Sequence, residues 1–104
     1  MAMGISVVRS LFEPLAERTW YVLSDSTIRL LGHQDQTMLT SAIVSWTDSA
    51  FNSQQVGRLV QELRAIGKQQ SLDERTHIEL EGAADLIERE SAGKSQLFVV
   101  FKGN

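Results

Sequence analysis

Residues 71–91 read SLDERTHIELEGAADLIERES, and the fold depends on whether this stretch forms one helix or a strand followed by a helix. The spacing of Ser71 and Glu74 matches a capping box, in which two side chains satisfy free N–H groups at the start of a helix. Small or apolar residues then recur every three or four positions, at Leu72, Thr76, Leu80, Ala83, Ala84 and Ile87. Both features favour a single helix.

The alternative is a strand over residues 76–81, where THIELE alternates between polar and apolar side chains. Gly82 would then break the run. Because the cap and the later periodicity agree with each other, we predict one helix from residue 72 to about residue 91, terminated by Gly93.

The segment before it gives the clearest helical pattern, over residues 53–66. One face carries five aliphatic residues, Val56, Leu59, Val60, Leu63 and Ile66. Asn52 or Ser53 would cap the N-terminus by accepting a hydrogen bond from a free backbone N–H. Gly67 suits the left-handed position that closes a helix, and Lys68 lies favourably at the negative end of the helix dipole.

The N-terminal half is predicted to contain a strand, a helix and a second strand. Residues 4–9 are short and β-branched, which is typical of a strand. Apolar residues recur at helical spacing over residues 14–31, although residues 19–23 would also suit a strand. Residues 38–46 alternate like a strand, and residues 47–53 have the composition of a turn.

The last predicted element is a strand over residues 96–102, whose consecutive apolar residues indicate burial on both faces. The predicted order is therefore β-α-β-α-α-β. This order corresponds to an α/β (α+β) fold in which helices pack on a small sheet. A chain of 104 residues fits one domain, residues 1–104.

The composition excludes several classes of protein. The chain has no cysteine, which rules out disulfides, thiolate chemistry and cysteine-ligated metals. The N-terminus lacks the long apolar run of a signal peptide, and the longest apolar run, residues 97–101, is too short to cross a bilayer. We therefore expect a cytoplasmic protein with no membrane contact. A net charge of −3 also lacks the basic footprint of direct nucleic-acid binding.

The triplet Gly93-Lys94-Ser95 resembles the end of a nucleotide-binding P-loop, but the surrounding residues exclude one. The first glycine of that motif would fall at position 88, which is Glu88. A P-loop also leads from a strand into a helix, whereas a helix here leads into a strand. Gly93 is better explained as a helix C-cap. No other motif for a cofactor or a metal site is present, so we expect neither.

Two histidines, His33 and His77, are the candidates for an enzymatic or ligand-binding function. On a helix, His77 would share one face with Asp73 and Glu81, a weak metal or general-base arrangement. No nucleophile or second cluster of ligands accompanies them. A small enzyme or ligand-binding domain that uses His33 or His77 is therefore the alternative function.

The charge distribution is uneven. Residues 71–90 hold seven acidic and two basic residues, a net charge of −5, whereas the rest of the chain carries +2. A concentrated acidic face attracts basic partners and speeds their encounter. The candidate contact residues on this helix are Glu79, Glu81, Asp85 and Glu88.

Two aromatic residues, Trp46 and Phe51, flank a polar turn and would make binding anchors if exposed. Together with the acidic helix, they lead to the primary hypothesis. The chain is a non-enzymatic protein-interaction domain, similar in action to small acidic inhibitor or immunity proteins, that docks on a basic protein. A homo-oligomer formed through a strand edge or an apolar helix face is a third alternative.

Overall fold

The structure of the chain is a computed structural model, which describes residues 3–8, 21–44, 48–93 and 96–102. Within these residues four strands form one antiparallel sheet with the order β2-β1-β4-β3. The strands are β1 (Met3–Val8), β2 (Tyr21–Leu23), β3 (Ser49–Asn52) and β4 (Phe98–Lys102). β1 and β4 thus pair at the centre although they come from opposite ends of the chain, and β2 and β3 form the edges.

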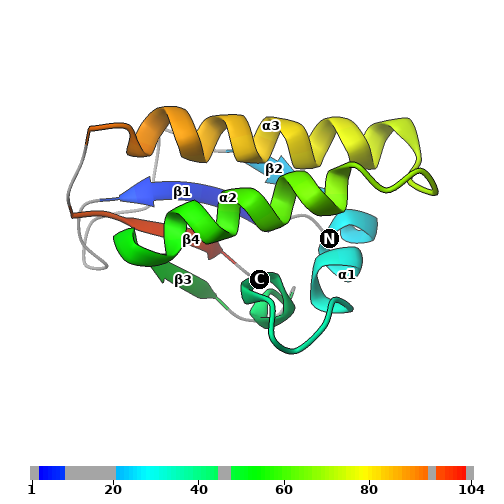
Figure 1. Cartoon of the computed structure of the whole chain (residues 1–104), viewed down its shortest axis with the longest axis horizontal. Coiled ribbons are helices and arrows are strands. Elements are labelled where there is room, and N and C mark those ends of the chain that lie inside the picture. The colour runs from blue at the N-terminus through cyan, green and yellow to red at the C-terminus, as the bar shows by residue number, and fades with distance from the viewer. Residues whose placement is uncertain (1–2, 9–20, 45–47, 94–95, 103–104) are drawn as a thin grey trace.

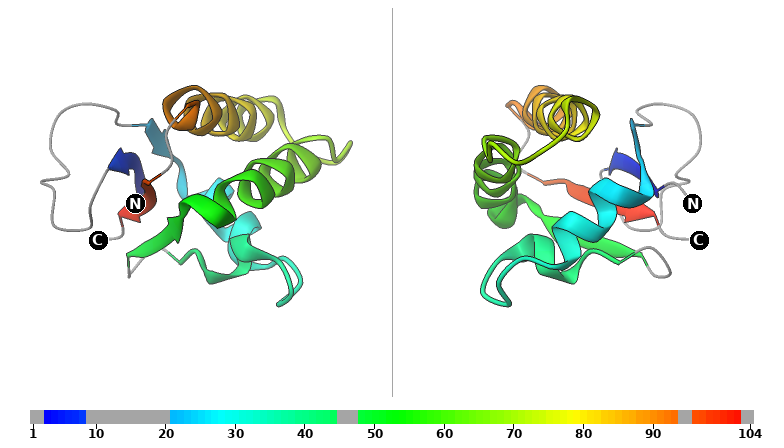
Figure 2. Two further views of the ribbon diagram at one scale, coloured as in Figure 1. Left: turned by 60° about the vertical axis from the view of Figure 1, so that its left-hand side comes forward. Right: turned by 90° about the vertical axis from the view of Figure 1, so that its right-hand side faces the viewer.

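The long helices α2 (Ser53–Gly67) and α3 (Glu74–Ser91) cover one face of this sheet (Figure 1). The shorter α1 (Asp25–Gly32) and the 3-10 helix η1 (Leu39–Ala42) pack against each other and contact α3 and α2, respectively. α2 and α3 lie side by side, with α3 over β1 and β2 and with α2 against β3 and β4 (Figure 2). The result is a mixed α+β fold, as the sequence predicted. None of the described helices is long and apolar enough to span a membrane.

The hydrophobic core lies between the sheet and the two long helices. From the sheet it contains Ile5, Leu23, Phe51, Val99 and Phe101. Phe51 contacts Phe101 edge to face, with ring centroids 5.7 Å apart and ring planes at 89°, an arrangement that aromatic pairs favour. Val99 and Val100 point to opposite faces of β4 and are both buried, which confirms the predicted burial on both faces.

The prediction for α2 is confirmed, and Asn52 is its N-cap. The Asn52 side chain accepts from the N–H of Gln54 and Gln55, and the Gln55 side chain accepts from the N–H of Asn52. The left-handed conformation predicted for Gly67 is wrong, because Gly67 is the last helical residue and Lys68 is the C-cap. The physical reason is that carbonyls of the last turn are satisfied without a left-handed residue: the Lys68 N–H donates to the Arg64 carbonyl and the Gln69 N–H to the Ile66 carbonyl, each at 3.1 Å. The ring of His77 donates from Nδ1 to the Gly67 carbonyl at 2.6 Å.

The prediction of one continuous helix over the acidic segment is also confirmed. α3 starts at Glu74 rather than at residue 72, because its N-cap is Asp73 and not Ser71. The Asp73 carboxylate accepts from the Thr76 N–H at 2.7 Å. Gly93 has a φ of +73°, as expected for a residue that closes a helix.

Gly82 does not break α3, and its lack of a side chain lets the helix lie close to β2. A Cβ atom at position 82 would stand 2.1 Å from the hydroxyl oxygen of Tyr21. Tyr21 in turn donates a hydrogen bond to the Ile78 carbonyl at 3.4 Å. The glycine therefore serves the contact between α3 and β2.

Three predictions for the first half of the chain are wrong in part. Residues 21–23 form β2 and not part of a helix, which starts only at Asp25; the expected helix over residues 14–20 lies outside the described residues. Within residues 38–44, the described part of the strand expected over residues 38–46, the chain instead forms η1. Glu62 accepts from the N–H of Leu39 and Thr40 and so holds the start of a helical turn.

The residues expected to form a turn before α2 instead contain β3. This strand pairs with β4 over four residues. The polar composition of Ser49 and Asn52 obscured it, but Phe51 between them is anchored in the core. A short strand with one buried residue gives only a weak alternation in sequence.

Candidate functional site

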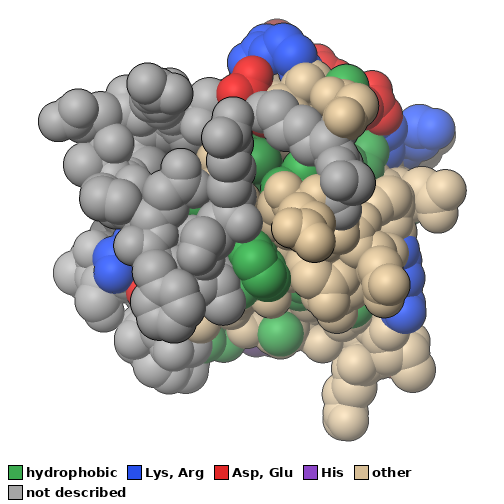
Figure 3. All heavy atoms as spheres, turned by 90° about the vertical axis from the view of Figure 1, so that its left-hand side faces the viewer, with side chains coloured by type: hydrophobic (Ala, Val, Ile, Leu, Met, Phe, Trp, Pro, Cys, Tyr) green, Lys and Arg blue, Asp and Glu red, His purple; other side chains and the backbone are tan. Residues whose placement is uncertain are grey.

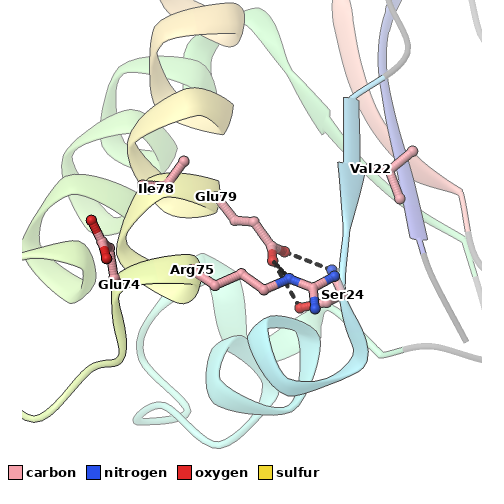
Figure 4. Close-up of a pocket in the computed structure, with 6 residues that line it drawn as sticks. All are labelled: Val22, Ser24, Glu74, Arg75, Ile78 and Glu79. Atoms are coloured by element: carbon pink, nitrogen blue, oxygen red, sulfur yellow. Dashed lines mark hydrogen bonds and ion pairs between the residues drawn. The ribbon is translucent and has the colours of Figure 1, made fainter.

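A surface hollow of about 540 Å³ lies where β2 meets the first half of α3. Figure 4 shows the residues that line it, Val22, Ser24, Glu74, Arg75, Ile78 and Glu79. Its two elements are joined by the pair Tyr21–Ile78 and by a polar network around Glu79. The hollow is thus formed by the fold itself and needs no rearrangement to exist.

The polar network centres on the buried carboxylate of Glu79. Ser24 donates to it from the backbone N–H at 2.6 Å and from the hydroxyl at 2.9 Å. Arg75, one helical turn earlier, contacts the same carboxylate at 3.2 Å, although 80% of its side chain is exposed. The donors of Ser24 are therefore used inside the protein, so the hollow offers few polar groups to a small polar ligand.

Two exposed aliphatic residues border the hollow. Ile78 on α3 is 58% exposed and Val22 on β2 is 51% exposed, and they are the large hydrophobic residues that the described part of the chain leaves exposed. Because side chains alternate along a strand, Val22 points away from the α3 side of β2 while Leu23 points into the core. Figure 4 shows Val22 directed away from α3.

Acidic side chains cluster further along α3. Arg64 on α2 contacts the carboxylates of Glu81 at 3.0 Å, Asp85 at 3.0 Å and Glu88 at 3.2 Å. One cation thus faces three anions, which leaves this surface negative. The pKa of Arg64 is raised, first by its hydrogen bond to Asp85 and further by the charges of Glu88, Asp85 and Glu81.

The acidic cluster and the hollow lie along one side of α3. With 3.6 residues per turn, positions four and seven apart fall near one line on the helix. Glu74, Ile78 and Asp85 have these separations and are all exposed. Figure 3 views α3 from its C-terminal end, where acidic and basic side chains lie together. The exposed isoleucine is therefore set in a mainly acidic row.

The structure places the residues predicted as contacts in different environments. Asp85 and Glu88 are exposed, with 66% of each side chain accessible, and Glu81 is half-buried at 33%. Glu79 is buried, and its carboxylate is already bonded to Ser24 and Arg75. It therefore does not belong to the solvent-exposed acidic surface of α3. Phe51 is 4% exposed and offers no anchor to a partner, because its ring fills the core. Trp46 lies outside the described residues.

The two histidines bond to backbone rather than to each other or to acids. His33 donates from Nδ1 to the Arg29 carbonyl at 2.6 Å at the end of α1. His77 does the same for Gly67 at the end of α2. Asp73 and Glu81, the expected neighbours of His77, are engaged by Thr76 and Arg64. Among the described residues, no group of three or more acidic or histidine side chains is arranged to hold a metal ion.

Sequence reasoning missed Val22, Ser24 and Ile78 as site residues. The position of Ile78 in the sequence could have identified it. Ile78 lies outside the apolar face of the helix, which carries Leu80, Ala83, Ala84 and Ile87. A large aliphatic residue on the polar side of an amphipathic helix is a sign of an exposed apolar contact. Val22 and Ser24 gave no comparable signal, because their positions depend on β2 being an edge strand.

Comparison with known proteins gives no relative: no protein-family model, no curated protein and no solved structure matches this chain.

Proposed function

We propose that the chain is a non-enzymatic protein-interaction domain that docks the exposed side of α3 on a basic protein. The observation that carries the proposal is the convergence of three carboxylates on the single guanidinium of Arg64. Two of them, Asp85 and Glu88, keep two thirds of their side-chain surface exposed. Their unused oxygens and excess charge are available to lysine or arginine side chains of a partner.

The position of these acids supports a role beyond helix stability. Glu88 and Glu90 are near the C-terminus of α3, where the helix dipole disfavours negative charge. Exposed ion pairs contribute only about 0–1 kcal/mol each. The contacts to Arg64 therefore add little to the stability of the fold, and they do not by themselves explain why this surface carries so much negative charge.

The alternative of an enzyme or ligand-binding domain has less support. His33 and His77 each use Nδ1 to satisfy a carbonyl at a helix end, a structural role that needs no substrate. We therefore retain the interaction domain, together with its expected cytoplasmic location, as the proposal.

The test neutralises Asp85 and Glu88 without disturbing the fold, as the double variant Asp85→Asn/Glu88→Gln. Glu81 is left unchanged because it holds Arg64 from a half-buried position. The matched control is Glu90→Gln, which removes one charge from the same helix at a side chain that contacts only Arg89 at 3.6 Å among the described ion pairs. Crosslinking in cells, followed by mass spectrometry, measures which proteins each variant contacts.

Wild-type protein and the Glu90→Gln control are expected to crosslink to the same basic protein through α3. The double variant is expected to lose this crosslink, and added salt is expected to weaken binding of the purified pair, because screening shortens the range of the attraction. Undiminished crosslinking of the double variant, with its circular dichroism spectrum unchanged, would show the proposal to be wrong.

A further inference from the structure

We infer that the outer edge of β2 accepts an extended segment of the partner as an added strand, with its side chains reaching the hollow at Ile78 on one face and Val22 on the other. This inference rests on the proposed function, since it names how the same partner engages the protein. Strand addition uses main-chain hydrogen bonds for affinity and flanking pockets for specificity.

The first support is that β2 is an edge strand among the described strands. In the part of the chain that the structure describes, β2 pairs with β1 on one side and with no strand on the other. The N–H of Ser24 points away from β1 to Glu79. Because backbone groups alternate in direction along a strand, the N–H and C=O of Val22, two residues earlier, point to the same outer side. Unpaired groups on an edge are a template for another strand.

The second support is the pair of exposed aliphatic residues beside this edge. Successive side chains of an added strand would point alternately to the two faces of the sheet. On the α3 face they would meet Ile78, and on the opposite face they would meet Val22, at 58% and 51% exposure. The two large exposed hydrophobic residues of the described chain thus stand where an added strand needs apolar contacts.

Charge complementarity points to the occupant. At the rim of the hollow, Arg75 is matched by Glu79, and Glu74 adds a negative charge that no described side chain neutralises. Asp85 continues the negative row on the same side of α3. A segment that alternates aliphatic and basic residues matches this arrangement, with its basic side chains toward Glu74 and Asp85.

The site is also preorganised. The hydrogen bonds between Glu79 and Ser24 and between Tyr21 and Ile78 fix β2 against α3. A partner segment would therefore be ordered on a surface that is already in place, which reduces the entropic cost of binding.

The experiment selects short random peptides, displayed on phage, on the immobilised full chain, and measures the affinity of the winners by fluorescence polarisation. We expect winners with alternating aliphatic and basic residues that slow hydrogen exchange of the Val22 amide. A version of each winner that is N-methylated at alternate positions is expected to bind about tenfold or more weakly, equal to about 1.4 kcal/mol or more, because it cannot make the main-chain bonds.

Two substitutions of Val22 distinguish the contribution of its backbone N–H to binding from that of its side chain. Val22→Pro removes the outward N–H at an edge position where proline is tolerated and is expected to abolish binding. Val22→Thr keeps that N–H and a β-branched shape and is expected to weaken binding only in part. Ile78→Gln is expected to reduce the preference for aliphatic residues. If Val22→Pro fails to fold, the N-methylated peptides still decide the question.

The inference is overturned if no peptide is enriched, if N-methylation leaves affinity unchanged, or if the Val22 amide is not protected. Light scattering of the protein alone tests a second copy as the occupant: a dimer that Val22→Pro dissociates would assign the edge to self-association and overturn the inference. Failure of the proposed function looks different. In that case the crosslink of Asp85→Asn/Glu88→Gln in cells is undiminished, while the selected peptides still bind the protein and still require their main-chain N–H groups.

Discussion

The carboxylate of Glu79 on α3 holds Ser24, the residue before α1, by accepting from both its N–H and its hydroxyl. Ser24 makes no side-chain cap of its own, so the start of α1 is fixed by a residue far along the chain. A carboxylate at this position is also favoured by the positive end of the helix dipole.

Glu62 on α2 plays the same role for η1. It is buried and accepts from the N–H of Leu39 at 3.1 Å and of Thr40 at 3.0 Å. Each glutamate is paired with an arginine four residues earlier, Arg75 with Glu79 and Arg58 with Glu62. In both long helices, an Arg-x-x-x-Glu pair therefore anchors one of the short helices of the N-terminal half.

Glu79→Gln is expected to lower the free energy of unfolding by about 1–3 kcal/mol, the usual cost of disrupting hydrogen bonds to a charged group. The amide keeps one acceptor oxygen but places an NH₂ group against the donors of Ser24 or Arg75. Urea denaturation followed by circular dichroism measures the change. Glu90→Gln, on the same helix, is the control and is expected to change stability by less than about 0.5 kcal/mol. Equal effects of the two substitutions would contradict a structural role for Glu79.

Gly82→Ala is expected to destabilise the protein by about 1–3 kcal/mol through overpacking, because the new Cβ would lie 2.1 Å from the Tyr21 hydroxyl oxygen. The control is Gly57→Ala in α2, where nothing lies within 4 Å of the new Cβ. That substitution is expected to stabilise by up to about 1 kcal/mol, since alanine is the better helix former.

Both glycines gain the same helix propensity on substitution, so the difference between the two variants reports the contact with Tyr21. Thermal or urea unfolding of the pair measures it. A stabilising Gly82→Ala, comparable to Gly57→Ala, would mean that α3 does not lie against the Tyr21 ring as described.

The two long helices were predictable because each carries an apolar stripe over several turns. The short elements were not. β2 has three residues and β3 has four, too few for a pattern to distinguish a strand from a turn. η1 depends on Glu62, more than twenty positions away, and no local preference of residues 38–46 encodes that contact.

The candidate site was predictable to a similar degree. The exposure of Asp85 and Glu88 follows from their position on the polar side of an amphipathic helix. Glu79 lies three residues after Thr76 and four before Ala83, beside the predicted apolar face, so helical geometry already separates it from Asp85 and Glu88. No local pattern gives its partner, Ser24, which lies 55 residues earlier. Phe51 was a candidate anchor on the condition that it was exposed, but it lies within β3 and its ring packs against Phe101 in the core.

The side chain of Tyr21 reports directly on the contact between β2 and α3, because it is the single tyrosine of the chain. Its pKa is raised above 10.0, first by burial and then by the negative charges of Glu79 and Asp85. The folded state thus favours the neutral phenol. This contribution to stability is complete below the ordinary tyrosine pKa and is lost as pH rises through the raised pKa of the folded protein.

Ultraviolet absorbance of the tyrosinate is therefore expected to appear at higher pH in the native protein than in the urea-unfolded chain. Asp85→Asn is expected to lower the native midpoint only part of the way, since burial is the largest cause of the shift. Glu90→Gln, whose carboxylate does not contribute to the shift of Tyr21, is expected to leave it unchanged. Identical midpoints in the native and unfolded states would mean that the phenol is fully solvated, and the packing of α3 on β2 through Gly82 would then be incorrect.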